Sequence, residues 1–384
     1  MTYSAEGWFL YAGEAGRTGP GPLVRETFEI SALGPEEVLA EPLFGSWEGN
    51  MGHAVERKPI DICVARKEPK VILGNSGVVR IKEVGRDVKT VRPGQKAIIF
   101  CNGEEDWWGY PKKILGYDAP NTMGCLATKM KLTQRQVIPL PENTRHPLAQ
   151  WAAFSLRYIT AWSNWELAYG TFRLLISRDE LASINVWGWG GGTTLAELDL
   201  ARREGHKAVM LSSTPRHLEV IRQLGVTEID RSKFGELGFD EAKYADDAGY
   251  RGRYQAAEKQ FLAEVDERTT GRGVQIFIDF VGAPVFRVSL KALAREGVIA
   301  TAGWKDGMKT SSLRAIECIA RHQHIHTHYA RYPQGWAAVA FANASGWLPP
   351  VDERVYTFDQ VPELAERYAA GEVGLFPVFS INEQ

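Results

Sequence analysis

From about residue 155 onward, short apolar runs alternate with amphipathic stretches, and this alternation limits the possible folds more than any other feature. The apolar runs are INVWGWG (184–190), KAVMLSS (207–213), VQIFIDFVG (274–282) and GVIATAG (297–303). Stretches of helical periodicity lie between them: TTLAELDLARREG (193–205), PRHLEVIRQLG (215–225) and PVFRVSLKALAREG (284–297). Strands that alternate with helices predict an α/β fold with a doubly wound parallel sheet made of right-handed βαβ units.

Two other regions follow different patterns. Residues 20 to about 150 are β-rich, with Gly and Pro between the runs EEVLAEPLF (36–44), SGVVRIKEVG (76–85), KAIIFC (96–101) and RQVIPLP (135–141), as in a small barrel or sandwich. The last 30 residues are typical of a strand, a helix, a Gly turn and a final strand. Segment 233–262 interrupts the alternation; we interpret it as a solvated helical insertion, with a functional lid as the alternative.

Bulk composition excludes several classes of protein. The 384 residues carry a net charge of −2 and are 44% hydrophobic, which argues against binding to nucleic acid or to an acidic membrane surface. We find no apolar run of about 20 residues and no signal peptide at the N-terminus, so we expect a soluble, cytoplasmic protein. The four cysteines are far apart, without the clustering of a zinc ribbon, and are expected to be reduced and buried. They are Cys63, Cys101, Cys125 and Cys318.

The glycine-rich segment after residue 186 carries the strongest chemical signal. An apolar strand runs into the glycines and then directly into an amphipathic helix. Glycines let the backbone turn sharply and approach a pyrophosphate, and a helix N-terminus offers free N–H groups and a partial positive charge. Because a second βα unit follows, we predict a dinucleotide site. Its residues are Gly188, Gly190, Gly191, Gly192 and Thr193.

The end of the next strand bears on which dinucleotide is bound. NAD sites usually place Asp or Glu there to hold the ribose 2′-hydroxyl, whereas this chain has Ser212 and Ser213, with Arg216 nearby. Hydroxyl and guanidinium groups suit a 2′-phosphate dianion. The pattern therefore predicts NADPH, although Arg216 could equally be a solvent-facing residue of a helical turn.

With these stretches in view, the chain resembles the medium-chain dehydrogenase/reductase superfamily. The resemblance also rests on VRPGQKAIIF (91–100), AAFSLRYITAW (152–162), IRQLGV (221–226) and TTGRGVQIFIDFVG (269–282). It implies a GroES-like domain over 1–155, completed by 350–384, and a Rossmann domain over 156–349, with the active site in the cleft. In VMLSS, VTEIDRS and HTHYARYPQGW the C-terminal half is similar to the crotonyl-CoA reductase/carboxylase and quinone/enoyl reductase enzymes. We also expect a homodimer.

The resemblance further implies that no metal is bound. Zinc members of the superfamily have a Cys ligand near the position of Glu48, and a His-Glu pair where this chain has Asn75 and Ser76 after Gly74. Glu48 and His53 could ligate a cation, but a working zinc site usually needs three protein ligands. A protein group or water must then stabilise the negative charge that forms and supply the proton.

Candidate catalytic residues lie in several segments. By resemblance, Thr160 lies near the nicotinamide ring, and Tyr117, Asp118 and His328 match positions in the crotonyl-CoA reductase group. Each also has a structural interpretation: Thr160 as a Thr in a helix interior, and Tyr117 and Asp118 as part of a Tyr-Asp-Ala-Pro corner. For His324, His326 and His328 it is an edge strand with solvated histidines, with a metal site as the alternative. A second cluster contains Glu48, Asn50 and His53, and the ordinary pKa of His suits a proton donor near pH 7.

Trp187 and Trp189 stand where the superfamily usually has small residues, and Thr194 replaces the last glycine. These departures leave open a crowded or altered cofactor site. We nevertheless predict a metal-independent, NADPH-dependent reductase of an activated double bond, in an enone or in a CoA or carrier-protein thioester. The alternatives are carbonyl or alcohol oxidoreduction, reductive carboxylation, and a non-catalytic nucleotide-binding protein.

Overall fold

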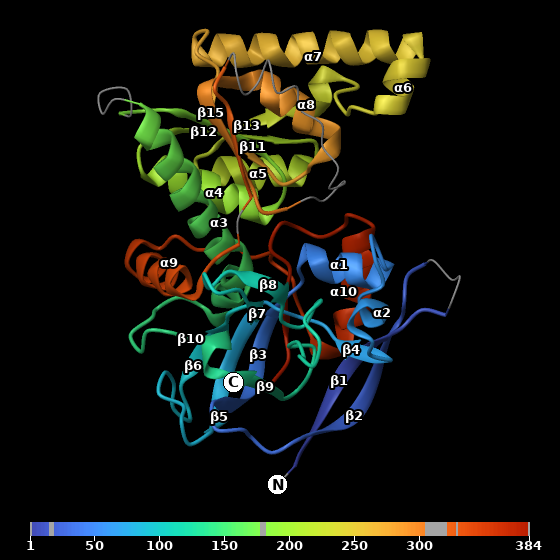
Figure 1. The fold of residues 1–384 in the computed structure, drawn as a ribbon, viewed down its shortest axis with the longest axis vertical. Coiled ribbons are helices and arrows are strands. Elements are labelled where there is room, and N and C mark those ends of the chain that lie inside the picture. The colour runs from blue at the N-terminus through green and yellow to red at the C-terminus, as the bar shows by residue number, and fades with distance from the viewer. Residues whose placement is uncertain (1, 15–18, 177–181, 304–320, 328, 383–384) are drawn as a thin grey trace. The chain divides into compact units, whose positions relative to one another are not determined.

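The computed structural model describes residues 2–14, 19–176, 182–303, 321–327 and 329–382. The chain divides into two compact units, which we call unit 1 (residues 1–159 and 330–384) and unit 2 (residues 160–329). Figure 1 shows the element order along the chain. One helix, α3 (Leu148–Leu175), contains the boundary between the two units.

Unit 1 is built mainly on antiparallel strands, with β17 and β18 paired in parallel. One sheet has the order β10-β6-β5-β3-β18-β17, with β9 also paired to β3, and a smaller sheet has the order β2-β1-β4. The strands are β1 (Tyr3–Tyr11), β2 (Leu23–Ile30), β3 (Glu37–Ser46), β4 (Lys70–Ile72), β5 (Gly77–Val84), β6 (Lys96–Ile99), β9 (Met130–Thr133), β10 (Val137–Pro139), β17 (Val355–Tyr356) and β18 (Val378–Ser380). Since β18 pairs with β3, the C-terminal segment contributes a strand to the sheet formed by the N-terminal part of the chain.

Unit 1 also contains the hairpin β7 (Asn102–Glu105) and β8 (Pro111–Ile114), the first part of α3 and four further described α-helices. The helices are α1 (Gly49–Glu56), α2 (Ile62–Arg66), α9 (Tyr332–Ser345) and α10 (Val361–Ala369). α1 directly follows β3, and α10 contacts α1. The core beneath them is apolar and includes Trp47, Met51, Leu73 and Phe379. The position of α1 is therefore fixed by both the N-terminal and the C-terminal parts of the chain.

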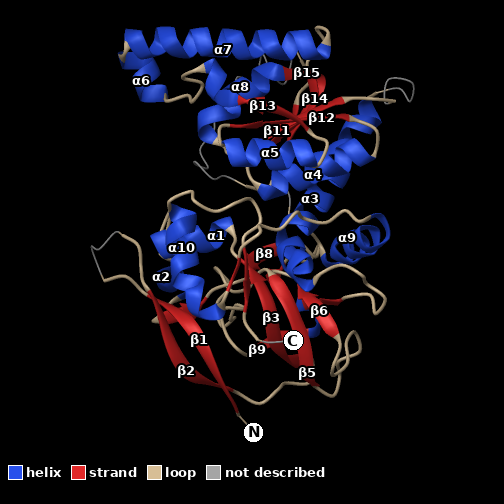
Figure 2. Ribbon diagram, turned by 180° about the vertical axis from the view of Figure 1, so that it is seen from behind, coloured by secondary structure: helices blue, strands red, loops and turns tan. Residues whose placement is uncertain are grey.

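Unit 2 contains a parallel sheet of six described strands in the order β13-β12-β11-β14-β15-β16, which confirms the predicted doubly wound sheet. The strands are β11 (Asn185–Trp189), β12 (Lys207–Ser212), β13 (Thr227–Asp230), β14 (Val274–Asp279), β15 (Leu293–Thr301) and β16 (His324–Thr327). Helices α4 (Gly192–Arg203) and α5 (Pro215–Gln223) cover one face, and α7 (Ala248–Thr269) and α8 (Ala283–Ala292) cover the other (Figure 2).

The interpretation of 233–262 as a solvated insertion was wrong in one respect. The segment forms α6 (Glu241–Asp246) and most of α7, and these helices are the crossover from β13 to β14. On α7 the residues Tyr250, Tyr254, Ala257, Phe261 and Val265 are buried at spacings of three and four. This is the stripe by which a helix covers a sheet. The charged residues that suggested an insertion lie on its other side.

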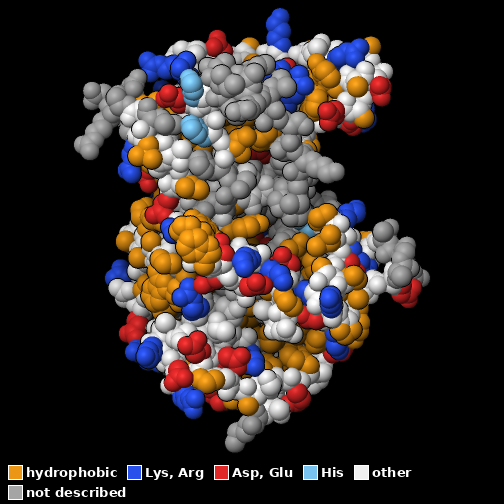
Figure 3. Space-filling model, in the orientation of Figure 1, with side chains coloured by type: hydrophobic (Ala, Val, Ile, Leu, Met, Phe, Trp, Pro, Cys, Tyr) orange, Lys and Arg blue, Asp and Glu red, His pale blue; other side chains and the backbone are white. Residues whose placement is uncertain are grey.

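The surface carries both signs of charge. On the face seen in Figure 3, cationic and anionic side chains are interspersed over the surface of each unit. Among the helices of the described residues, none is both long and apolar enough to span a membrane.

Candidate functional site

The loop between β11 and α4 has the geometry of an anion-binding turn. Gly190 has a φ of +151°, and a Cβ there would lie 2.2 Å from Thr194 Oγ1, so a side chain is excluded. Gly191 is the N-cap of α4; it has no side-chain cap, and a Cβ at Gly191 would meet nothing within 4 Å. The first turn of α4 contains no acidic residue. No side chain therefore caps the first N–H groups of α4, an arrangement that suits a pyrophosphate.

The two tryptophans of β11 do not crowd this turn. Both are buried and lie on the sheet face covered by α7 and α8: Trp189 packs on Phe261 at 5.3 Å, and its Nε1 donates to Ser289 Oγ. Thr194 is also buried, and its hydroxyl donates to the carbonyl of Trp189 at 3.4 Å. The departures from the family pattern fill the core beneath the loop rather than the space in front of it.

A pocket of about 270 Å³ lies at the carboxyl ends of β12, β13 and β14, where nucleotides bind in open parallel sheets. Its polar lining residues are Ser213, Arg231 and Ser232, and its apolar ones are Leu237, Val281, Pro284 and Val285. A hydroxyl and guanidinium set next to an apolar slot fits a 2′-phosphorylated adenosine. The residues present therefore fit NADPH.

The predicted ribose-phosphate residues are placed unequally around this pocket. Ser213 lines it. The Ser212 hydroxyl accepts a hydrogen bond from the N–H of Thr214, and Arg216 lies exposed on the first turn of α5, outside the pocket lining. Arg231, which no pattern in the sequence indicates, supplies the guanidinium of the lining. It comes close because β12 and β13 pair in register, Ser212 opposite Asp230.

Asp279, the last residue of β14, stabilises the turn that contains Val281, one of the pocket's lining residues. Its carboxylate accepts from the N–H groups of Val281 and Gly282 and from Ser289 Oγ. Burial raises the pKa of Asp279 to about 6, against the opposing effect of these donors. The carboxyl group thus fixes the turn that leads into α8.

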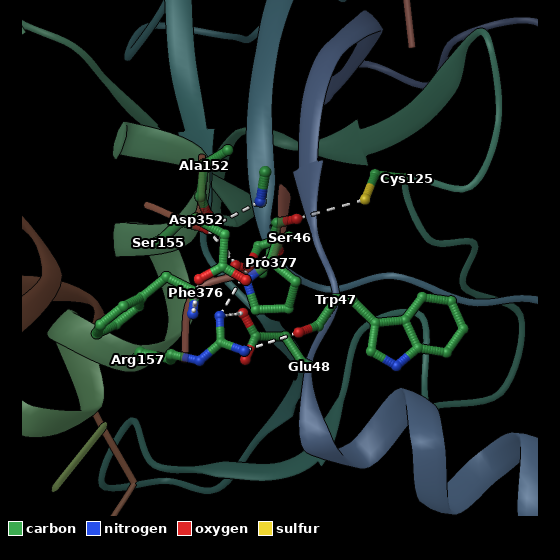
Figure 4. A network of polar contacts seen from close by, with 12 residues as sticks. Ser46, Trp47, Glu48, Cys125, Ala152, Ser155, Arg157, Asp352, Phe376 and Pro377 are labelled. Carbon is green, nitrogen blue, oxygen red and sulfur yellow. Dashed lines mark hydrogen bonds and ion pairs between the residues drawn. The ribbon is translucent and has the colours of Figure 1, made fainter. Parts of the chain in front are cut away.

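In unit 1, Glu48 lies in a buried polar network (Figure 4). The guanidinium of Arg157, on α3, donates to Glu48 Oε1 at 2.8 Å, to Ser46 Oγ at 2.7 Å and to the Trp47 carbonyl at 2.7 Å. Burial raises the pKa of Glu48, while Arg157 and the hydroxyls of Ser76 and Ser46 act to lower it. Arg157 was not predicted, because it is 109 residues away from Glu48 in the sequence.

The other residues of this cluster lie on α1. Asn50 and His53 are three residues apart and share one face of the helix. Asn50 Oδ1 is buried and accepts no hydrogen bond from the described protein groups, and neither amide atom of the fully buried Asn75 has a partner there. Buried polar atoms of this kind usually bind water or a ligand.

The second predicted cluster, Tyr117 and Asp118, follows β8 in unit 1. Asp118 accepts a hydrogen bond from the N–H of Ile114 at 2.6 Å, and the Tyr117 carbonyl accepts from Arg66 at 3.0 Å. The carboxylate of Asp118 thus closes the turn, as the structural interpretation expects. The Tyr117 side chain is partly buried against the core.

Three further expectations concern Thr160 and the histidines. Thr160 is partly exposed on α3, one turn beyond Arg157. His328 lies outside the described residues, and the strand that precedes it, β16, is the outermost of the described sheet. Within the ranges that the structure describes, no three His, Cys, Asp or Glu side chains are grouped to hold a metal ion.

Comparison with known proteins confirms the resemblance inferred from the sequence. No protein-family model matches the chain. Acryloyl-coenzyme A reductase of Sulfurisphaera tokodaii is 24% identical over 311 residues, which cover 78% of this chain and 80% of that protein. The mitochondrial NAD(P)H oxidoreductase RTN4IP1 of Danio rerio is 23% identical over 368 residues, covering 91% and 84%.

Among solved structures, the 2-octenoyl-CoA carboxylase reductase CinF, in complex with NADP and 2-octenoyl-CoA, is similar with a TM-score of 0.80 at 20% identity. The match covers 99% of this chain and 89% of CinF. The chain therefore has the fold of the medium-chain dehydrogenase/reductases, a GroES-like domain with a Rossmann domain.

Proposed function

We propose that the protein is an NADPH-dependent, metal-independent reductase that delivers hydride to an activated carbon–carbon double bond, in an enoyl thioester or an enone. The observation that carries this is the nucleotide site of unit 2, where the N-terminus of α4 and a pocket containing Ser213, Arg231 and Ser232 lie at the same edge of the sheet, since β11 stands between β12 and β14. The names of similar proteins, an acryloyl-CoA reductase and a 2-octenoyl-CoA carboxylase reductase, support a thioester acceptor.

The residues of unit 2 would hold the cofactor. Bound NADPH supplies the hydride. The N–H groups of Gly191 and Gly192 and the dipole of α4 suit the pyrophosphate, and Arg231 with Ser213 and Ser232 suits the 2′-phosphate. Thr160 is proposed to lie beside the nicotinamide, and Gly188, Gly190 and Thr193 to shape the turn.

The acceptor needs a hydrogen bond and a proton. Hydride addition to the β-carbon moves the electron pair toward the carbonyl oxygen, and the resulting enolate takes a proton at the α-carbon. We propose Tyr117 as the hydrogen-bond donor to an enolate, because a phenol donates without losing its proton. For a carbonyl acceptor, His53 would be the acid and Asn50 its polar neighbour. Asp118 and Glu48 would support these groups.

The test is NADPH oxidation by the purified protein with a panel of enoyl thioesters, enones, quinones and aldehydes, each with and without bicarbonate. We expect turnover with an enoyl thioester or enone that survives exhaustive chelation. Activity with aldehydes alone would favour carbonyl reduction, and a carboxylated product would favour reductive carboxylation. Tight nucleotide binding without turnover on any acceptor would indicate a non-catalytic protein.

We further propose a homodimer that acts in the cytoplasm. The strand β16 is an edge of the described sheet, and its Ile325 is 42% exposed, which suits pairing with a second copy. Among the described residues Cys63, Cys101 and Cys125 form no disulfide, which suits a reducing compartment; Cys318 lies outside the described residues. Sedimentation would determine the mass in solution.

A further inference from the structure

One cation binds three consecutive residues of the chain. Arg157 donates to Ser46 Oγ, to the Trp47 carbonyl and to Glu48 Oε1, at 2.7 to 2.8 Å. Its side chain is 7% exposed and that of Glu48 is 3% exposed. The guanidinium also lies over the ring of Phe376, at 5.7 Å.

Stability alone does not explain this ion pair. Removing two charges from water costs about as much free energy as their attraction returns, so an apolar pair of similar volume is often equally stable. A buried pair held by further hydrogen bonds instead fixes one arrangement of the backbone around it. Here that backbone is the link between β3 and α1.

The same link is held from a second side. The N–H of Trp47 and the hydroxyl of Ser46 both donate to the carbonyl of Pro377, at 3.1 and 3.0 Å. Asp352 accepts from the N–H groups of Gly374 and Phe376 and so orders the segment that leads to Pro377 (Figure 4). Of the groups named here that bond to the link, Arg157 alone carries a positive charge that can balance the carboxylate of Glu48.

The Glu48 side chain is diverted from its local role. Glu48 is the N-cap of α1, yet its carboxylate makes no capping bond and points to Arg157 instead. The groups that also face the pair are Tyr368, Cys101 and Cys125, and burial raises the pKa of each. These groups are neutral near pH 7, so the partner of Glu48 is Arg157.

We propose that Arg157 is a positioning residue of the reaction centre: it fixes the link Ser46–Glu48 and thereby orients α1, which carries Asn50 in its first turn and His53 in its last. The inference rests on the proposed function, which uses these two side chains. Arg157 lies one helical turn before Thr160 on α3, so the same helix would carry the residue beside the nicotinamide and the residue that orients α1.

Four variants test this: Arg157→Met, Arg157→Lys, the double variant Glu48→Met/Arg157→Met, and the control Arg80→Met, which removes a partly exposed pair with Glu41 in the same unit. We expect Arg157→Met to lower kcat 100-fold or more, with KM changed less than threefold and NADPH affinity within twofold. Arg157→Lys should recover part of kcat. The double variant should unfold at nearly the wild-type urea concentration yet keep the low kcat. Arg80→Met should leave kcat within twofold.

Recovery of both stability and kcat in the double variant would overturn the proposal, since the pair would then be structural only. A second readout is independent of turnover: the pH titration of the His53 ring, followed by NMR with labelled histidine. We expect its midpoint to change in Arg157→Met and in the double variant but not in Arg80→Met. An unchanged His53 titration in all variants would contradict the positioning role, even if the wild type reduces none of the proposed acceptors.

Discussion

The link after β11 and the link after β3 both lead from a buried strand into a helix, yet they use their polar groups in opposite ways. Neither helix has a side-chain cap, but after β11 Gly190 and Gly191 place no side chain at all before the first N–H groups of α4. After β3, the side chains of Ser46 and Glu48 and the Trp47 carbonyl are bound by Arg157. An open backbone suits a ligand from outside, whereas a link held from within suits the orientation of side chains for chemistry.

The largest expected effect tests whether unit 1 serves chemistry rather than binding. Loss of a general acid typically costs 10²–10⁴-fold in rate. We therefore expect His53→Ala to lower turnover by about that factor on a carbonyl acceptor, and Tyr117→Phe on an enoyl acceptor. NADPH affinity should stay within about twofold, a few tenths of a kcal/mol. Steady-state kinetics and a fluorescence titration measure the two quantities. If both variants keep full turnover, water is the donor.

The next prediction concerns Gly190, in the link between β11 and α4. Gly190→Ala should destabilise the protein by about 2–4 kcal/mol, because its positive φ and the contact with Thr194 both penalise a side chain. The matched control is Gly205→Ala, where φ is +92° but space is open, with an expected cost of about 1 kcal/mol. Urea unfolding measures both. Equal stability of Gly190→Ala and wild type would show that the turn has a different backbone.

Gly191→Ala should separate binding from folding. Its Cβ meets no protein atom, so the stability of the variant should be within about 0.5 kcal/mol of wild type. The added methyl group would enter the space assigned to the pyrophosphate, and NADPH affinity should fall about tenfold, or 1.4 kcal/mol. Undiminished affinity would place the pyrophosphate elsewhere.

Arg231 and Arg216 provide the next comparison. Arg231→Ala should weaken NADPH by about 10–100-fold and leave NADH nearly unchanged, since a hydrogen bond to a charged group contributes about 1.5–3 kcal/mol. Arg216→Ala should change NADPH affinity less, because Arg216 does not line the pocket. Titrations of each variant with NADPH and with NADH measure these affinities. A larger loss of NADPH affinity in Arg216→Ala than in Arg231→Ala would indicate that the 2′-phosphate binds at the first turn of α5.

The smallest effect concerns His206, directly before β12 and therefore at the end of that strand opposite Ser212. Burial against Trp165 and Tyr169 lowers the pKa of His206, so the fold favours its neutral form. Its contribution to stability is complete above the ordinary value of about 6.5 and is lost as the pH falls through the lower folded value. As the pH is lowered from 8 to 5, the free energy of unfolding should fall less steeply in His206→Phe than in the wild type. If the unfolding free energies of wild type and His206→Phe change in parallel with pH, other groups cause the loss of stability in acid.

Local patterns predicted much of the fold but little of the site. The parallel sheet, the glycine turn and the C-terminal strand follow from periodicity within short segments. The burial of Trp189 does not, because a strand pattern does not say which helix covers which face. Local patterns do not reveal Arg157, which bonds Glu48 from 109 residues away. They do not reveal Arg231 either, because strand pairing brings it to the pocket that Ser213 also lines. The stripe from Tyr250 to Val265 was present in the sequence and would have identified α7.

The central claim is hydride transfer from NADPH to an activated double bond, and isotope transfer tests it most directly. The protein would be incubated with NADPH deuterated at nicotinamide C4 and an enoyl thioester, and the product examined by NMR and mass spectrometry. The account predicts one deuterium on the β-carbon and a proton from solvent on the α-carbon, with no change after chelation. Deuterium on a carbonyl carbon, or none in any product while NADPH binds tightly, would contradict it.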